Sequence, residues 1–317
     1  MKPLVSVIVP VKDRRNLLLR CLDSIKRQTY RPLEVLVVDN GSSDGTPEAV
    51  QCWGIRNSTK DFRVKVLFES TPGACAARNK GLNQAMGQLT VFFDSDDTMR
   101  ENLVNRAVEV FTKSPETDVV CWKVDIHQLD GSLRQPPFNP HRAMEDHLVN
   151  AILRTQGYMA RTGLFRSVGG WDEDLKGWND WELGVRILLT HPKVVGVDET
   201  LVDVYSQEDS ITGKDFSSKA GRWEKSLDAV RQDIMESDTP DKGHLLRIVS
   251  YREIILAAHY AREGSQELAR RLLTDSLADR PDSKHTLSLK DKLLLRLAYG
   301  YTRKGGRGAW RLLRFLL

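Results

Sequence analysis

Three carboxylates occupy four positions in the segment TVFFDSDDTM, residues 90–99. Asp94, Asp96 and Asp97 follow an apolar run that is typical of a buried strand. Like charges this close raise one another's pKa unless a cation or a set of donors lies among them. In an extended segment Asp94 and Asp96 point the same way, because side chains alternate with a period of two. Carboxylate oxygens suit a hard divalent cation, so the segment is a candidate metal site, with an Asp-rich surface turn as the alternative.

A second acidic stretch follows the apolar run LEVLVVD, residues 33–39. The tight Asn-Gly turn after Asp39 is expected to leave its carboxylate facing a crevice, where it could accept a hydrogen bond from a base N–H. Asp44, before Gly45 and Thr46, is expected to cap the next helix. Asp13, after the first apolar run, is either the N-cap of the following helix or a pocket residue.

The elements that position these acids alternate along the first part of the chain. Apolar runs at 5–10, 33–39, 64–69 and 89–94 are separated by stretches with helical periodicity. Such runs indicate parallel strands covered by helices on both faces, so the fold class is α/β. Ligands of these sheets bind beyond the carboxyl ends of the strands. The acids should therefore gather along one edge, in a carboxylate-rich crevice.

Several classes of protein are disfavoured by the sequence. There is no G-x-G-x-x-G after the first strand and no G-x-x-x-x-G-K-[ST], which argues against a dinucleotide-binding domain and a P-loop enzyme. The four cysteines are widely spaced, which suits a reducing, cytoplasmic compartment. The first apolar stretch is too short to span a membrane, and no pattern requires nucleic acid.

The pattern changes near residue 118, so the chain is expected to have further parts. A hairpin with Asp130-Gly131 as its turn, a helix over about 144–154, a Gly/Trp-rich loop at 169–180 and a helix over about 181–189 are predicted. Beyond about residue 215 the chain is expected to be helical. We therefore expect a domain at 1–214, with parts at 1–117 and 118–214, and a helical extension at 215–317.

Five segments in order carry a resemblance: VSVIVPVKDR, EVLVVDNGSSDGT, PGACAARNKGL, FFDSDD and GGWDEDLKGWND. Over about residues 3–212 the chain resembles family 2 glycosyltransferases of the GT-A fold. The resemblance implies a Rossmann-type, mainly parallel sheet and inverting transfer of a sugar from a nucleotide donor, commonly a UDP-sugar. It also implies a divalent metal, Mn²⁺ or Mg²⁺, whose charge would stabilise the diphosphate leaving group.

The resemblance also assigns roles on the donor side. Asp96 matches the main metal ligand, and Asp94 should lie near the ribose or the metal. Arg78 is placed against the base, with a surface cation or a salt bridge to a neighbouring Asp as the alternatives, and Asn79 supports the same loop. The nucleotide-binding residues implied are Pro10, Val11, Asp13, Asp39, Arg78 and Asp94.

On the acceptor side, Asp180 matches the family's general base, although Asn179 stands where an acid is common. Trp178 and Trp181 could stack on a sugar or pack into the core. Glu182 is a candidate acceptor contact, or a first-turn charge that the helix dipole favours. Gln207 stands roughly where many relatives carry a metal-completing His, which favours a non-catalytic nucleotide-sugar-binding or scaffold protein as an alternative.

The C-terminal segment 289–317 carries eight Lys or Arg against one acid, Asp291. Its mixture of Leu, Trp, Tyr and Phe with basic residues is typical of an interfacial helix on an anionic membrane, and a helix packed on its own domain or a partner is the alternative. The sequence thus predicts a cytoplasmic-side glycosyltransferase acting on a glycan or lipid-linked acceptor. A nucleotidyltransferase is less favoured, because VPVKDRRN lacks a glycine-rich phosphate loop.

Overall fold

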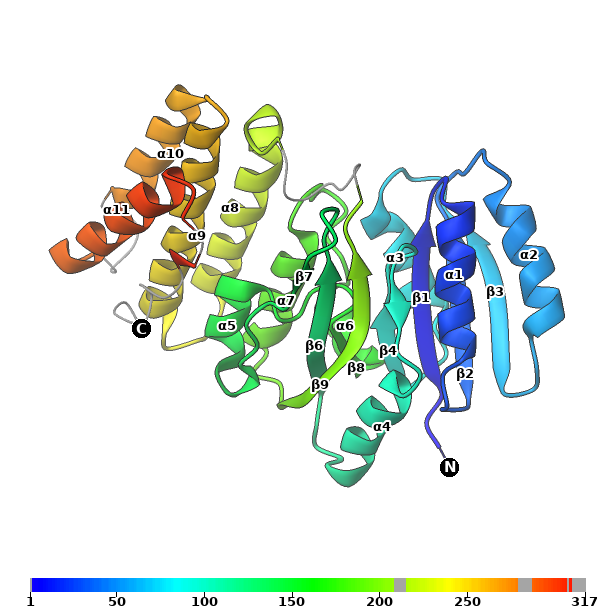
Figure 1. Cartoon of the computed structure of the whole chain (residues 1–317). Coiled ribbons are helices and arrows are strands. Elements are labelled where there is room, and N and C mark those ends of the chain that lie inside the picture. Colours follow the sequence, from blue (N-terminus) through cyan, green and yellow to red (C-terminus); the bar gives the residue numbers. More distant parts are fainter. Residues whose placement is uncertain (1, 208–214, 279–286, 307, 310–317) are drawn as a thin grey trace. The chain divides into compact units, whose positions relative to one another are not determined.

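The computed structural model describes residues 2–207, 215–278, 287–306 and 308–309 (Figure 1). They divide into two compact units. The first unit holds residues 2–146, 150–174 and 179–207, and the second holds 147–149, 175–178 and the described residues from 215 onward. The predicted domain boundary at residue 214 and the last part of the basic segment, 310–317, lie outside the described residues.

The first unit is built on one sheet. Within the described ranges nine strands pair in the order β3-β2-β1-β4-β8-β6-β9-β5, with β7 on β6. Strands β1 to β4 are parallel, as are β6 and β9, whereas β8 is antiparallel to both β4 and β6. The mainly parallel α/β fold is thus confirmed. The strands are β1 Val5–Val11, β2 Leu33–Asp39, β3 Phe62–Phe68, β4 Leu89–Phe92, β5 Thr98–Met99, β6 Val119–His127, β7 Leu133–Arg134, β8 Tyr158–Arg161 and β9 Val194–Tyr205.

Helices cover both faces of this sheet. Val7 and Val9 of β1 belong to one core, with helices α1 (Arg15–Lys26), α2 (Thr46–Asn57) and α4 (Leu103–Lys113). Ile8, between them, belongs to the opposite core, with α3 (Ala74–Gln84), α6 (Thr162–Ser167) and α7 (Asn179–Leu189). The alternation follows from the two-residue period of a strand, and it explains why the strand sequences are apolar throughout.

Two local expectations have different outcomes. The Asp130-Gly131 turn is confirmed, since Gly131 has a φ of 79° and the turn joins β6 to β7. The helix predicted over 144–154 is wrong at its end, because α5 covers only Ala143–Asn150. Ala151 has a left-handed φ of 52°, which stops the helix and turns the chain towards β8.

The second unit is helical, as expected. It contains α8 (Ala220–Glu236), α9 (Lys242–Arg262), α10 (Gln266–Leu277) and α11 (Leu289–Arg303), and α9 packs against the other three. Arg231 of α8 and Glu253 of α9 form a buried ion pair with two 2.6 Å contacts. No helix in the described part of the chain is long and apolar enough to cross a bilayer.

Candidate active site

Asp94 lies just beyond β4 and is paired with a buried arginine. Arg78 Nη2 donates to Asp94 Oδ1 at 2.8 Å, and the guanidinium carbon lies 4.2 Å from the centre of the Trp171 ring. Burial is the largest single influence and opposes the charge of Arg78, but Asp94, Cys75 and Asp180 together outweigh it, so the net Arg78 pKa is raised. Arg78 Nε is buried and has no partner among the described residues. The pair therefore keeps one buried donor without a protein partner.

Asp96 is paired on the other side of the segment. Its carboxylate forms an ion pair with Arg14, and its main-chain carbonyl accepts from Arg20 Nη2. Burial and the neighbouring Asp94 raise the pKa of Asp96, while Arg14 lowers it. The neighbouring negative charges therefore still disfavour the ionised form of Asp96. A divalent cation near Asp94 and Asp96 would relieve this repulsion.

Asp97 differs from its two neighbours. It is 2% exposed, and its carboxylate accepts from Gln156 Nε2 and, at 2.9 Å, from the main-chain N of Tyr205. Burial, then Asp94 and Asp96, raises its pKa well above the usual range. The third carboxylate therefore anchors the acidic segment to the end of β9.

Asp39 lies at the carboxyl end of β2 and is 4% exposed. Its Oδ2 accepts from the main-chain N of Gly41 and of Ser42, both at 3.2 Å, because Gly41 adopts a φ of 80°. Its Oδ1 is buried without a partner among the described residues. Pro10 and Val11 lie beside it, since β1 and β2 pair Pro10 with Val38 and Val11 with Asp39.

Asp13 does not cap α1, so that alternative is wrong. Its φ of 50° turns the carboxylate towards the neighbouring loop, where Oδ1 accepts from the Ser43 N at 2.6 Å. The first helical N–H, of Arg15, donates instead to Asp44 Oδ2 at 3.1 Å. Asp44 Oδ1 also accepts from the Thr46 N at 3.0 Å, so one carboxylate caps two helices.

Two asparagines fix the loops around Arg78. Asn40 Nδ2 donates to the carbonyls of Glu69 and Thr71, and its Oδ1 accepts from the Gly73 N at 2.7 Å, directly before α3. Asn79 bonds both the N and the O of Trp171, at 2.8 and 2.9 Å. These clamps hold the start of α3 and the Trp171 ring next to Arg78. The sequence predicts a supporting role for Asn79 but not for Asn40.

Glycine is required beside this clamp. Gly170 has a φ of 70°, and a Cβ at this position would lie 2.6 Å from Asn79 Oδ1. The glycine before Trp171 thus lets the loop approach α3 closely enough for both bonds.

Asp180, at the start of α7, lies within electrostatic range of three buried groups. The negative charge of Asp180 acts to raise the pKa of Arg78, of Arg154 and of Tyr158. Burial lowers the pKa of Arg154 to about 10 despite the opposing effect of Asp180. Burial and then Asp180 raise the pKa of Tyr158, whose hydroxyl has no partner among the described residues. Sequence reasoning missed Arg154, which lies between α5 and β8, and Tyr158, which begins β8, because neither residue lies in a motif.

The remaining acceptor-side predictions lie in three different environments. Trp181 is fully buried, which fits its core-packing alternative. Glu182 is 2% exposed and bonds Arg186, four residues along α7, through both carboxylate oxygens. Trp178 belongs to the second unit, where Arg252 lies 4.4 Å from its ring centre. Their contacts with an acceptor stay predictions.

Comparison with known sequences decides the family. The Glycosyl transferase family 2 profile matches residues 6–167, which is half of the 317-residue chain. The chain belongs to glycosyl transferase family 2. It is 34% identical over 121 residues to the glycosyltransferase GlyG of Streptococcus pneumoniae, an alignment that covers 38% of each protein. This chain aligns with less than two thirds of the length of such curated relatives.

Solved structures support the GT-A-like fold of this family 2 glycosyltransferase. S. aureus TarS 1-349 in complex with UDP-GlcNAc superimposes with a TM-score of 0.69 at 21% identity, over 96% of this chain and 93% of that one. The mannosyltransferase PcManGT of Pyrobaculum calidifontis, in complex with GDP-Man and Mn²⁺, gives a TM-score of 0.62 at 20% identity, over 100% and 84%. At these identities the likeness concerns the fold.

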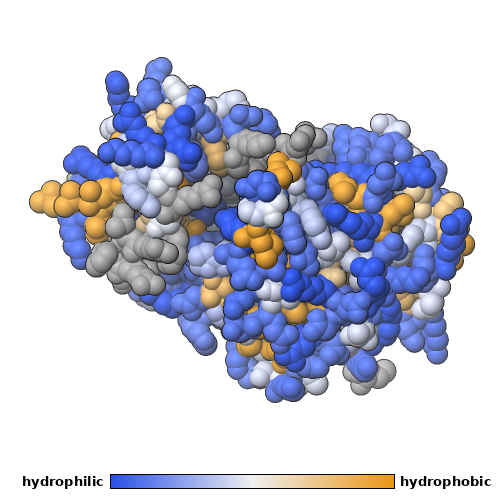
Figure 2. Space-filling view, viewed as in Figure 1, coloured by the Kyte–Doolittle hydropathy of each residue, from blue (hydrophilic) through white to orange (hydrophobic). Residues whose placement is uncertain are grey.

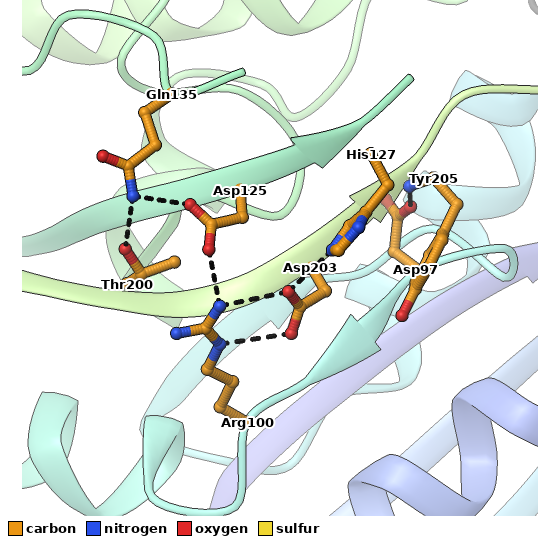
Figure 3. Close-up of polar contacts among 8 residues, drawn as sticks. All are labelled: Asp97, Arg100, Asp125, His127, Gln135, Thr200, Asp203 and Tyr205. Atoms are coloured by element: carbon orange, nitrogen blue, oxygen red, sulfur yellow. Dashed lines mark hydrogen bonds and ion pairs between the residues drawn. The ribbon is translucent and has the colours of Figure 1, made fainter. Parts of the chain in front are cut away.

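A second charged cluster of the glycosyltransferase lies along β6 and β9 (Figure 3). Arg100 donates to both carboxylate oxygens of Asp203, each at 3.1 Å, and to Asp125 at 2.6 Å. His127 Nε2 lies 2.9 Å from Asp203 Oδ1, and its ring stacks on Tyr205 with 4.8 Å between centroids. The cluster thereby supports the Tyr205 backbone that holds Asp97.

Asp94 and Asp96 stay the predicted ligands of a divalent metal. Two carboxylates suit a cation whose other ligands come from a diphosphate and water. Within the described ranges, no group of three or more His, Cys, Asp or Glu side chains is arranged to hold a metal by itself. Gln207 Nε2 donates to the Tyr205 carbonyl at 3.4 Å, and its predicted place near the metal stays a prediction.

Proposed function

We propose that this chain is an inverting glycosyltransferase that moves a sugar from a nucleotide-sugar donor, with a UDP-sugar favoured, to a hydroxyl of a glycan or lipid-linked acceptor. It would serve polysaccharide or cell-surface glycan synthesis on the cytoplasmic side of the membrane. The observation that carries the proposal is Asp39 Oδ1 at the carboxyl end of β2, which is buried and has no partner among the described residues. A carboxylate oxygen accepts hydrogen bonds, and the ring N–H of a base would supply the missing donor.

The diphosphate would lie against the acidic segment. Asp96, with Asp94, would hold Mn²⁺ or Mg²⁺, and the cation would stabilise the charge of the leaving diphosphate. Arg14 is about one-third exposed and pairs with Asp96, so it could transfer its donors to a phosphate when Asp96 binds the metal. Arg78 would keep Asp94 oriented and would present to the nucleotide its Nε, which has no partner in the described part of the chain.

Asp180 would act on the acceptor. Its carboxylate would take the proton of the acceptor hydroxyl while that oxygen attacks the anomeric carbon. The bond from this carbon to the donor oxygen would break in the same step, and its electron pair would leave with the nucleoside diphosphate. One displacement of this kind inverts the configuration at the anomeric carbon.

The donor site can be tested without knowing the acceptor. We would titrate UDP, GDP and dTDP into the protein by calorimetry, with and without Mn²⁺, and compare Asp39→Asn with the exposed control Asp61→Asn. Because an amide presents a donor where the base needs an acceptor, binding of the preferred nucleotide should weaken by about tenfold or more in Asp39→Asn and stay unchanged in Asp61→Asn. Failure of all three nucleotides to bind would reject the proposal.

The transfer step needs a second readout. With the preferred donor and a panel of hydroxyl acceptors, the anomeric configuration of the product can be read by nuclear magnetic resonance. An inverted product supports the single displacement, and a retained one excludes it. Nucleotide binding without transfer across the panel would favour the alternative of a nucleotide-sugar-binding protein, for which Gln207 is the motivating residue.

A further inference from the structure

Helix α11 of the second unit has two apolar faces instead of one. Its inner face contributes Leu295, Ala298 and Thr302, all of which are buried, and α11 packs against α9. Large apolar residues also lie on its outer face, and Figure 2 shows this end of the helical unit as hydrophobic. The outer residues are Leu289, Leu293, Leu297 and Tyr301, with exposed fractions of 88%, 59%, 53% and 49%.

These four residues form a continuous stripe. They are spaced by four positions, and side chains at this spacing lie next to one another along a helix. At a rise of 1.5 Å per residue the stripe is about 18 Å long. Single exposed apolar residues are ordinary on protein surfaces, whereas a contiguous row of them marks an interaction surface. We name it the outer stripe.

The charges around the outer stripe have one sign. Five basic residues of the described part of this segment accompany it, namely Lys290, Lys292, Arg296, Arg303 and Lys304. The acid of the segment, Asp291, forms a capping box with Ser288 and so serves the start of the helix. A second copy of this surface would bring like charges together, whereas anionic phosphates would be complementary to it.

The positions of the basic residues agree with an interfacial helix. At 100° per residue, Lys292, Arg296 and Arg303 follow one edge of the outer stripe and Lys290 follows the other. Long basic side chains beside an apolar face can keep their stems in the apolar layer while their charges reach the headgroups. An 18 Å stripe on a helix that cannot span the bilayer suits a helix lying in the plane of the interface.

We propose that α11 binds the surface of an anionic lipid bilayer, with the outer stripe among the upper acyl chains and the flanking basic residues on lipid phosphates. This membrane contact would bring the enzyme to a lipid-linked acceptor. The inference rests on the surface of α11, and it does not require the donor site or Asp180 to act as proposed.

Vesicle sedimentation tests the proposal directly. The full chain would be mixed with vesicles of phosphatidylcholine alone, or of phosphatidylcholine with an equal amount of phosphatidylglycerol. We would compare Leu293→Ser/Leu297→Ser with Leu129→Ser/Leu133→Ser, whose leucines are each 55% exposed at the β6–β7 hairpin. A charge pair, Arg296→Gln/Arg303→Gln, has Arg56→Gln/Arg63→Gln as its control on exposed residues of the first unit.

The expected result is binding to the mixed vesicles and little to the neutral ones. The leucine pair in α11 should weaken the partition coefficient by about tenfold or more. The arginine pair should weaken it by about 25-fold, since each basic residue near an anionic surface contributes about fivefold. Both control pairs should bind as the unmodified chain does. Thermal unfolding followed by circular dichroism should show all four variants to be folded, because the altered residues are exposed.

Three results would overturn the proposal. These are no binding to the mixed vesicles, equal binding to both kinds, or binding that survives the α11 leucine substitutions. A self-associated form seen by analytical ultracentrifugation and lost in Leu293→Ser/Leu297→Ser would also overturn it, because the face would then belong to a second copy. Donor binding measured without vesicles should be unchanged in every variant, which separates this proposal from the proposed function.

Discussion

Two charged regions of the first unit differ in how their polar atoms are satisfied. Around Arg100, on β6 and β9, each charged group is paired within the chain: Arg100 with Asp125 and Asp203, and Asp203 also with His127 (Figure 3). At the strand ends near Asp94 the ion pairs are as close. That region, however, contains four buried polar atoms without partners among the described residues, namely Asp39 Oδ1, Arg78 Nε, Tyr158 Oη and Trp171 Nε1.

We interpret the fully paired Arg100 cluster as part of the scaffold, and the region near Asp94 as the proposed ligand site. A buried donor or acceptor left without a partner costs about 1–3 kcal/mol, so a fold retains several of them where a ligand can complete the hydrogen bonds. A network in which every polar group is already paired stabilises the fold, but it has no free donor or acceptor for a ligand. Unpartnered atoms, rather than the density of charge, therefore distinguish the proposed donor site from the Arg100 cluster.

The largest expected effect comes from Asp180. In Asp180→Asn the acceptor hydroxyl has no base, so kcat should fall by about 10²–10⁴-fold. Nucleotide binding should remain within about twofold, because Asp180 has no proposed contact with the donor. Steady-state transfer and calorimetric titration measure the two quantities. Full transfer activity in Asp180→Asn would show that another group removes the proton.

The next prediction compares substitutions of two neighbouring residues, Asp96 and Asp97. Asp96→Asn should weaken Mn²⁺-dependent nucleotide binding by at least about tenfold, because a metal ligand is lost. Asp97→Asn should leave that binding nearly intact and instead lower the free energy of unfolding by about 1–3 kcal/mol, because the Tyr205 N or the Gln156 amide loses its acceptor. Calorimetry and urea unfolding of both variants give the comparison. Equal losses of metal-dependent binding would mean that the segment acts as one unit.

The contrast between Asp96 and Asp97 also shows the limit of sequence reasoning. Strand periodicity was enough to predict the parallel α/β sheet and to place Asp39 and Asp94 at its carboxyl edge. It could not tell the anchoring Asp97 from its neighbours, because that depends on Gln156 and Tyr205, which are distant in sequence.

The partners of Arg78 and Asp180 were hidden for the same reason. Trp171 was visible only as part of a loop motif and Arg154 only as the end of a predicted helix, whereas Tyr158 lay outside any motif. Their proximity to the site depends on β8 pairing antiparallel with β4 and on the Asn79 clamp. Long-range contacts of this kind leave no local period in the sequence. The roles of Asp180, Arg78 and Asp96 themselves remain predictions until the variants are measured.

The smallest expected effect is in the Arg100 cluster. Burial alone would raise the pKa of Asp203. The hydrogen bonds with Arg100 and His127 have a larger effect in the opposite direction, so the net pKa lies below its usual range. A lowered folded-state pKa means that the ionised carboxylate stabilises the fold above the unfolded pKa of about 3.9, and that this contribution is lost as the pH falls through the folded-state value. At neutral pH, Asp203→Asn should lower the free energy of unfolding by about 1–2 kcal/mol.

Urea unfolding of the unmodified chain, Asp203→Asn and Asp198→Asn would test this scaffold role. Asp198 lies on the same strand, is 85% exposed and pairs with Lys123 at the surface, so its substitution should have little effect. The difference between the unmodified chain and Asp203→Asn should shrink as the pH falls through the folded-state pKa of Asp203, below about pH 4. Metal-dependent nucleotide binding should persist in Asp203→Asn, because a saturated network offers no group to the donor. If that binding fell as far as in Asp96→Asn, the Arg100 cluster would be part of the donor site, and the distinction between the two regions would fail.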